Sequence, residues 1–265
     1  GGVPAVMNAL LKAGKLNNLS LTVNGRTVAD NYADTTTKDT EVIRTFLKPM
    51  LENAGFIVLK GNIFDSAVMK TSVISDSFRS QYLDKPGSLN IFEARAIVFE
   101  GPEDYHSRIN DPQLNIDVDC ILVIRGCGPV GYPGSAEVVN MQPPDRLIRE
   151  GILELPTLGD GRQSGTSASP SILNASPESA VGGGLALLKT GDMLRIDLNQ
   201  GSLDVLLDES ELQKRRGQLK TEVIENQTPW QEIYRDTVGQ LSSGGIIELA
   251  AKYRKIRNTI PRHSH

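Results

Sequence analysis

The sequence predicts a mostly β fold with some α-structure, a barrel or a sandwich over about residues 55–207. Short β-prone runs predict its strands, and clusters of Gly, Pro, Asn and Asp separate many of them. The 265 residues include 25 glycines and 14 prolines against one Trp, six Tyr and six Phe. A chain so rich in turn-forming residues and so poor in large rings favours β-structure with many corners. The predicted strands are residues 56–59, 67–73, 94–99, 120–125, 151–157, 192–198 and 202–207.

The chain begins with a predicted helix. Apolar residues at positions 3, 6, 7, 10 and 11 share one helical face, and Gly14 is a typical residue at a helix end. Residues 19–23 then alternate before Asn24-Gly25, which predicts a β-hairpin. A helix at the start, followed by a lone hairpin and a polar stretch over residues 30–45, indicates that these residues are the end of a larger structural unit.

Helices are also predicted within the β region and after it. Glu211 is placed to reach Arg215 at i+4 in a charged helix. Thr228 and Pro229 predict the start of a later helix, as its N-cap and its first residue. Gln200-Gly201 predicts a hairpin between the last two strands. The helix candidates are residues 143–150, 177–188, 208–219, the segment from 229 to Gly244-Gly245, and 246–257.

Composition excludes several classes of function. The formal net charge of −4 offers no basic field for a nucleic-acid backbone. No apolar run approaches the roughly 20 residues of a membrane span, and the first residues, Gly-Gly-Val-Pro, do not have the pattern of a signal peptide. Two cysteines, Cys120 and Cys127, cannot form a disulfide scaffold or a four-thiolate metal site. We therefore expect a soluble, cytoplasmic protein with neither nucleic acid nor membrane as partner.

Two loops carry the densest candidate chemistry. Residues 160–170 follow an apparent strand and combine Asp160, Arg162 and glycines with hydroxyl side chains that include Ser164 and Thr166. The spacing fits neither a nucleophile elbow nor a P-loop, so a Ser/Gly surface loop is the structural alternative. Residues 125–137 hold four glycines and two prolines and end at Glu137. That lone acid suits a hard metal ion, or else a helix N-terminus.

The other polar candidates favour structural roles. His106 lies in a predicted turn, where most histidines are surface or hydrogen-bonded groups. Cys127, just after a strand, is interpreted as a small packed residue rather than a reactive thiol. The basic run at residues 214–216 has no aromatic interleaving and is interpreted as a solvated helix face.

The same two loops resemble a known family. Residues 128–137 (Gly-Pro-Val-Gly-Tyr-Pro-Gly-Ser-Ala-Glu) and 160–165 (Asp-Gly-Arg-Gln-Ser-Gly) are similar to the dihydroxyacid dehydratase/6-phosphogluconate dehydratase family. The sugar-acid branch, the arabinonate and xylonate dehydratases, fits them best. Further blocks follow in family order over almost the whole chain, at residues 1–7, 59–62, 101–106, 174–178 and 228–265.

The resemblance implies a fold and a division into domains. It implies a swivelling β-barrel, similar to that of aconitase-type enzymes, at residues 53–210. Residues 1–52 would be the end of an N-terminal α/β domain, and residues 211–265 a C-terminal helical segment and tail. The family's cluster cysteines would lie upstream, so this chain would contribute none. We also expect a homo-oligomer, a dimer or tetramer.

The implied reaction removes water from a sugar acid to give a 2-keto-3-deoxy acid, with an iron–sulfur cluster (2Fe-2S) and Mg²⁺ as cofactors. By motif match, Glu137 would bind Mg²⁺ and Ser164 would be the base, as an alkoxide. Thr166 would bind substrate or orient Ser164. Arg162 would pair with the substrate carboxylate or brace the loop, and His265 would reach an active site.

Two alternatives stay open. The parent could instead be the dihydroxyacid dehydratase of branched-chain amino-acid biosynthesis. The chain by itself could be an inactive β-barrel fragment, because it would hold only part of the site.

Overall fold

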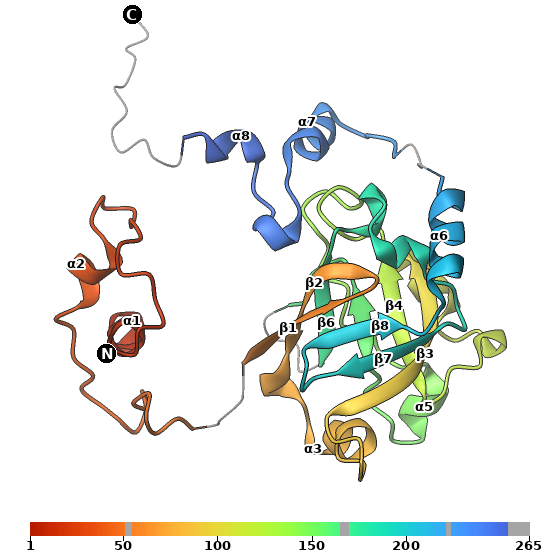
Figure 1. Ribbon diagram of the computed structural model, residues 1–265, viewed down its shortest axis with the longest axis horizontal. Helices are drawn as coiled ribbons and strands as arrows, with labels where there is room; N and C mark the ends of the chain where they lie inside the picture. The colour runs from red at the N-terminus through yellow and green to blue at the C-terminus, as the bar shows by residue number, and fades with distance from the viewer. Residues whose placement is uncertain (51–54, 165–169, 221–223, 254–265) are drawn as a thin grey trace, which may run out of the picture. The chain divides into compact units, whose positions relative to one another are not determined.

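The computed structural model describes residues 1–50, 55–164, 170–220 and 224–253 (Figure 1). By their internal contacts the described residues form two compact units, residues 1–50 and residues 55–253. The second unit therefore holds the β-barrel together with the helices that follow it.

The first unit is built on two helices, α1 (Gly2–Lys12) and α2 (Val28–Tyr32). α1 confirms the predicted helix, and Gly14 follows it with a positive φ of 66°. The buried side chain of Asn8 donates to the carbonyl oxygens of Tyr32 and Ala33, at 2.8 and 2.6 Å, and so joins the two helices. The predicted hairpin is wrong in extent, because its arms share only the isolated bridge Leu21↔Thr27.

The second unit is an eight-stranded closed barrel of mixed strand direction, which confirms the barrel and excludes the sandwich. Its strands follow one another around the barrel in the order β1-β2-β6-β5-β4-β3-β7-β8. They are β1 (Phe56–Gly61), β2 (Phe64–Lys70), β3 (Ile91–Glu100), β4 (Cys120–Arg125), β5 (Thr157–Gly159), β6 (Ser171–Ser176), β7 (Met193–Asp197) and β8 (Ser202–Val205).

Four predictions for this region are wrong in detail. The residues of the predicted turn that holds His106 form a helix, α4 (Gly101–Arg108), because Pro102 suits a first helical turn and Glu103 and Asp104 favour its N-terminus. β5 begins at Thr157, where the predicted strand 151–157 ends. β6 was not predicted, because its sequence Ser-Ile-Leu-Asn-Ala-Ser has polar ends and only a short apolar centre, and it pairs with β2, about 100 positions earlier in the chain, as well as with β5. The predicted helix 177–188 is two short 3₁₀ turns instead, since Gly182 adopts a left-handed conformation between them.

Four neighbouring strands, β3 to β6, run parallel, so their carboxyl ends meet at one edge of the barrel. Such strands are covered on both faces, and β4 is accordingly a continuous run of buried apolar residues. The loops that leave this common edge carry both motifs singled out in the sequence.

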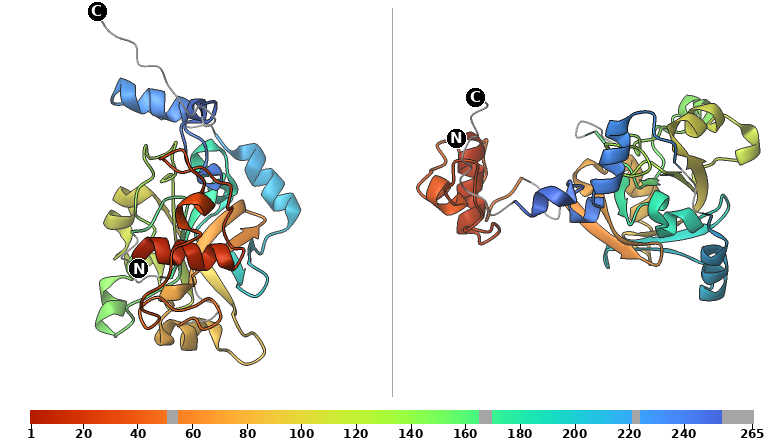
Figure 2. Two further views of the ribbon diagram at one scale, coloured as in Figure 1. Left: turned by 90° about the vertical axis from the view of Figure 1, so that its left-hand side faces the viewer. Right: turned by 90° about the horizontal axis from the view of Figure 1, so that it is seen from above.

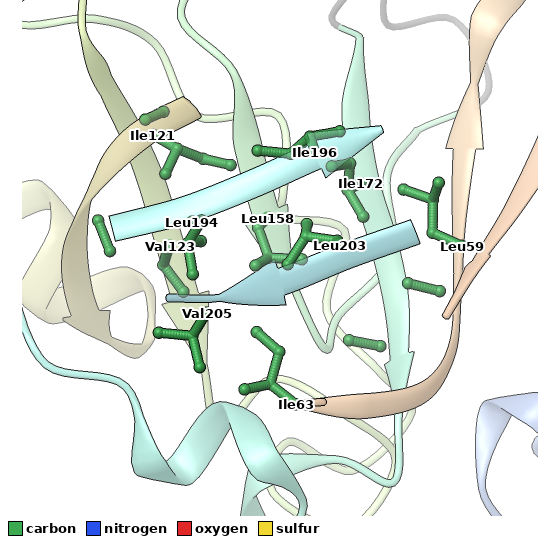
Figure 3. Packing of buried hydrophobic residues seen from close by; sticks show 14 of the residues in the cluster. Leu59, Ile63, Ile121, Val123, Leu158, Ile172, Leu194, Ile196, Leu203 and Val205 are labelled. Carbon is green, nitrogen blue, oxygen red and sulfur yellow. The ribbon is translucent and has the colours of Figure 1, made fainter. Parts of the chain in front are cut away.

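Two apolar clusters sandwich the barrel wall. The first fills the barrel, where side chains from opposite strands converge, among them Leu59, Val123, Leu158 and Leu203 (Figure 3). The second lies outside β3 and β4, beneath the helices α4 (Gly101–Arg108) and α5 (Asp145–Arg149). It includes Cys120 and Cys127, both wholly buried, which confirms that Cys127 is a packed residue.

Helix α6 (Glu209–Gln218) lies on a different side of the barrel from α5 (Figure 2). Arg215 holds it there with a bidentate contact to Asp192, at 2.6 and 3.0 Å, between side chains that are 10 % and 9 % exposed. The predicted Glu211–Arg215 pair is confirmed at 2.9 Å.

The remaining elements are short. α7 (Pro229–Thr237) begins as predicted, with Thr228 accepting from the Gln231 amide as N-cap. The others are η1 (Thr71–Val73), α3 (Asp76–Phe78), the π turn η2 (Arg79–Leu83), η3 (Pro112–Leu114), η4 (Ser179–Val181), η5 (Gly184–Leu187), η6 (Leu241–Ser243) and α8 (Glu248–Ala251). Among the residues described, no helix is long and apolar enough to cross a bilayer.

Candidate active site at the carboxyl edge of the barrel

A buried carboxylate ties three loops of the common edge together. Asp160 follows β5 directly and is wholly buried. Its Oδ1 accepts from the Cys127 amide at 2.9 Å. Its Oδ2 accepts from the Gly126 amide at 3.1 Å and from both the amide and the hydroxyl of Ser179, at 2.9 and 2.6 Å. The loops after β4, β5 and β6 are thus joined through one side chain.

A second buried carboxylate holds the middle of the loop after β4. Glu178, 1 % exposed, accepts from the amides of Val130 and Gly131 at 2.8–3.1 Å. The side chain of Gln240 also donates to it, at 2.8 Å. Burial raises the pKa of the Glu178 carboxyl, and the hydrogen bonds from Gly131, Val130 and Gln240 oppose that rise.

Glu137 and Arg162 lie side by side. They are partners in an isolated parallel bridge, in which the Arg162 amide donates to the Ala136 carbonyl at 2.8 Å and the Val139 amide to the Arg162 carbonyl at 3.1 Å. Both side chains are about half exposed, 50 % for Glu137 and 47 % for Arg162. Their charged groups are 3.9 Å apart, a contact too long and too exposed to contribute much stability.

Arg162 also holds the backbone of the loop that leads to Glu137. Its Nε donates to the Ser135 carbonyl at 2.7 Å, two residues before Glu137. The next position back, Gly161, has to be glycine, because a Cβ there would lie 2.8 Å from the Ala136 carbonyl oxygen. The structure thus shows the bracing contact that was one of the two roles considered for Arg162.

The same segment holds unusual backbone conformations. Ser135 and Asn174 are non-glycine residues with φ near +60°, and Asn174 donates its amide to the Gly161 carbonyl at 2.9 Å. Within the described parts of the chain, the Ser135 hydroxyl and the Asn174 side-chain carbonyl are buried without a hydrogen-bond partner. Strained backbone and unsatisfied polar atoms are common at functional sites, and here both occur at Ser135 and Asn174, next to the bridge of Glu137 and Arg162.

Comparison with known proteins identifies the family of the chain. The family described as "Dihydroxy-acid/6-phosphogluconate dehydratase C-terminal" matches residues 41–245, which include the whole barrel. The chain belongs to the dihydroxy-acid/6-phosphogluconate dehydratase family. The resemblance inferred from residues 128–137 and 160–165 is thereby confirmed.

Individual relatives in this dehydratase family favour its sugar-acid members. The chain is 58 % identical over 265 residues to the D-xylonate dehydratase of Caulobacter vibrioides, covering 100 % of this chain and 44 % of that protein. It is 40 % identical over 216 residues to the L-arabinonate dehydratase of Rhizobium leguminosarum bv. trifolii, covering 81 % and 35 %. Identity to the dihydroxy-acid dehydratase of Clostridium beijerinckii is 34 % over 251 residues, covering 94 % and 42 %. The chain spans less than half the length of these relatives.

Of the residues that the family motifs predict for the site, the structure brings Glu137 and Arg162 together. Ser164 lies two residues beyond Arg162 on the same loop and is partly exposed. Thr166 and His265 lie outside the described residues, so their roles stay predictions.

A cavity at the same edge of the barrel does not coincide with these residues. It has a volume of about 630 Å³ and opens at the same edge of the barrel, between Arg125, Gly131, Ser179 and the end of α6. Glu137, Arg162 and Ser164 are not among its lining residues.

The donor set limits which metal groups this chain can hold. Glu137 offers exposed carboxylate oxygens, which Mg²⁺ prefers, and Mg²⁺ commonly takes only one or two carboxylates from a protein. In the parts of the chain that the structure covers, no group of three or more His, Cys, Asp or Glu side chains could hold a metal ion. Cys120 and Cys127 do not fit a cluster, because they lie at opposite ends of β4 and are wholly buried. Burial raises the pKa of both thiols, that of Cys120 to about 11.

Sequence reasoning missed the two residues that organise the site. Asp160 and Glu178 both stood inside quoted motifs but received no role. A signal was available for Asp160, since an acid placed between a buried strand and a glycine often caps the neighbouring loop. No local signal marked Glu178, because its donors lie 47 and 48 residues away.

Proposed function

We propose that the full-length protein is a hydro-lyase that dehydrates a sugar acid, an aldonate, to a 2-keto-3-deoxy acid. Membership of the dehydratase family supports the reaction class. The names of the relatives at 58 % and 40 % identity, xylonate and arabinonate dehydratases, support the substrate class. The observation that carries the proposal in this chain is the pairing of Glu137 with Arg162 at the carboxyl edge of the barrel, two residues from Ser164.

Each residue has a role in this proposal. Ser164 would take the proton from C2 of the substrate, as a general base. Glu137 would bind Mg²⁺, and Arg162 would keep the loop in place while its exposed guanidinium faces the substrate carboxylate. Thr166 would orient Ser164 or bind substrate, and His265 would complete the site. When bound, Mg²⁺ would balance the negative charge of the substrate and the cluster iron would act as a Lewis acid on the departing hydroxyl.

The cluster ligands would come from outside this chain, since its cysteines do not fit the cluster. The site would therefore be complete only in the full-length protein. The expected dimer or tetramer stays a prediction, which sedimentation of the full-length protein tests.

A substrate panel tests the proposal. The full-length enzyme, reconstituted without oxygen with iron, sulfide and Mg²⁺, would be assayed for keto-acid formation from xylonate, arabinonate, fuconate, galactonate, gluconate and 2,3-dihydroxyisovalerate. We expect turnover of a pentonate or a hexonate. Turnover of dihydroxyisovalerate alone would instead identify the protein as a dihydroxyacid dehydratase of amino-acid biosynthesis. No turnover of any substrate, with an intact cluster, would refute the proposed activity. The isolated 265-residue chain, assayed in parallel, is expected to be inactive.

Replacement of Glu137 by glutamine tests the proposed metal ligand. The amide keeps the size of the side chain but removes its charge, so Mg²⁺ loses its charged ligand. We expect the Mg²⁺ concentration for half-maximal activity to rise at least about tenfold, the equivalent of roughly 1.4 kcal/mol. Glu103→Gln, on helix α4, is the matched control. An unchanged Mg²⁺ dependence would remove Glu137 from the metal site.

A further inference from the structure

The loop between β4 and Glu137 has no regular secondary structure, so its position depends on the groups that bind it. Glu178 binds its midpoint, through the amides of Val130 and Gly131. From that midpoint, successive turns lead to the proposed metal ligand. The Tyr132 amide donates to the Gly128 carbonyl at 2.9 Å, and the Ser135 amide donates to the Tyr132 carbonyl at 2.7 Å. A displacement of the midpoint would therefore be passed on to Glu137.

Glu178 is itself held by a residue far along the chain. Gln240 follows α7, and its side chain pairs with Glu178 at two points. Its Nε2 donates to the Glu178 carboxylate at 2.8 Å, and its Oε1 accepts from the Glu178 amide at 2.7 Å. The pair fixes both the carboxylate and the backbone from which it projects.

Two more hydrogen bonds join residues 235–242 to the site. Arg235, on α7, donates from its Nε to the Val130 carbonyl at 2.8 Å. The amide of the same residue, Val130, donates to Glu178. The Ser242 amide donates to the Ser176 hydroxyl at 3.2 Å, at the end of β6. Residues 235–242 thus contact both the loop and the strand end from which Glu178 projects.

The packing around Glu178 leaves no room for adjustment. A Cβ on Gly128 would lie 2.5 Å from the Glu178 Oε2 and 2.6 Å from its Cβ. Gly128 does not have a positive φ, so an alanine there would be excluded by this contact rather than by backbone strain. Gly128→Ala therefore disturbs Glu178 without a change to Gln240 itself.

We propose that Glu178 is a positioning residue for the loop that ends at Glu137. Gln240, because it binds Glu178, makes this positioning depend on residues 235–242. The proposal rests on the proposed role of Glu137 in Mg²⁺ binding. It adds that residues 235–242, which contain none of the predicted site residues, set the affinity of the site for its metal ion.

The first test needs no bound metal and no activity. In the full-length enzyme prepared without Mg²⁺, Gln240→Ala is expected to speed hydrogen exchange at the Val130 and Gly131 amides by about tenfold, the loss of one hydrogen bond to a charged group. Exchange in β4 should not change. Gln213→Ala is the matched control, because Gln213 is exposed on α6 and its side chain binds Glu209 within the same helix. Unchanged exchange at Val130 and Gly131 would overturn the proposal.

The second test separates positioning from a general loss of structure. For Gln240→Ala, the Mg²⁺ concentration for half-maximal activity should rise about tenfold, while kcat at saturating Mg²⁺ stays within about twofold of the parent. A fall in kcat that excess Mg²⁺ does not restore would contradict a positioning role. Gly128→Ala should give the same two results, and it keeps the test decisive where Gln240→Ala fails to fold.

The two proposals fail in different ways. If Glu137→Gln leaves the Mg²⁺ dependence unchanged, the proposed metal ligand is wrong, whatever Gln240→Ala does to amide exchange. If Glu137→Gln weakens Mg²⁺ binding but Gln240→Ala changes neither exchange nor Mg²⁺ dependence, only the positioning role is wrong.

Discussion

Ser164→Ala in the full-length enzyme is expected to lower kcat for the preferred aldonate by about a thousandfold, the usual contribution of a positioned general base. The methyl group that replaces the Ser164 hydroxyl cannot accept the C2 proton. Because Ser164 is partly exposed on a segment without regular secondary structure, the change should leave the barrel intact. The measurement is keto-acid formation under saturating substrate and Mg²⁺.

The control for this prediction is Ser107→Ala. Ser107 is exposed on α4, and its hydroxyl binds only within that helix, donating to the Asp104 carbonyl. Iron content, Mg²⁺ dependence and melting temperature should match the parent in both variants. Retention of more than a few per cent of kcat by Ser164→Ala would exclude Ser164 as the base and leave Glu137 and Arg162 as a binding site without the proposed proton acceptor.

The parts of the fold that could be predicted are those written in local sequence. β4 was predicted with its observed ends, because a run of buried apolar residues lies between an acid and a glycine. α7 was predicted from Thr228 and Pro229, since an N-cap and a first-turn proline act on their own neighbours. β6 was missed because its strand character comes from β2 and β5 rather than from its own sequence.

The site divides in the same way. Family motifs pointed to Glu137, Arg162 and Ser164 individually, but not to the bridge that brings Glu137 and Arg162 together. That bridge joins segments 25 positions apart, and only the parallel order of β4 and β5 places them side by side. The burial of Glu178 was equally out of reach, because an acid in a polar loop is exposed in most proteins.

Asp160→Asn is expected to cost about 3 kcal/mol of stability, because it leaves a buried donor facing another donor. All four groups around the Asp160 carboxylate donate to it, three to Oδ2 and one to Oδ1. The asparagine carbonyl can replace Oδ2, but its NH₂ group then faces the Cys127 amide at a hydrogen-bond distance. The opposite orientation is worse, since the NH₂ group would face Gly126 and Ser179 together.

For a unit of about 200 residues, such a loss lowers the melting temperature by roughly 10 °C. Asp65→Asn is the matched control, because Asp65 is exposed on β2 and loses little when its charge is removed. Amide exchange distinguishes the cause. Exchange should rise at Gly126, Cys127 and Ser179, where the loops after β4 and β6 are attached to Asp160, before it rises in the barrel strands. If Asp160→Asn instead melts within about 1 °C of Asp65→Asn, the carboxylate does not hold the loops together. The hydrogen bonds of Glu178 and Arg162 to the loop backbone would then be sufficient to hold the site in place without the Asp160 carboxylate.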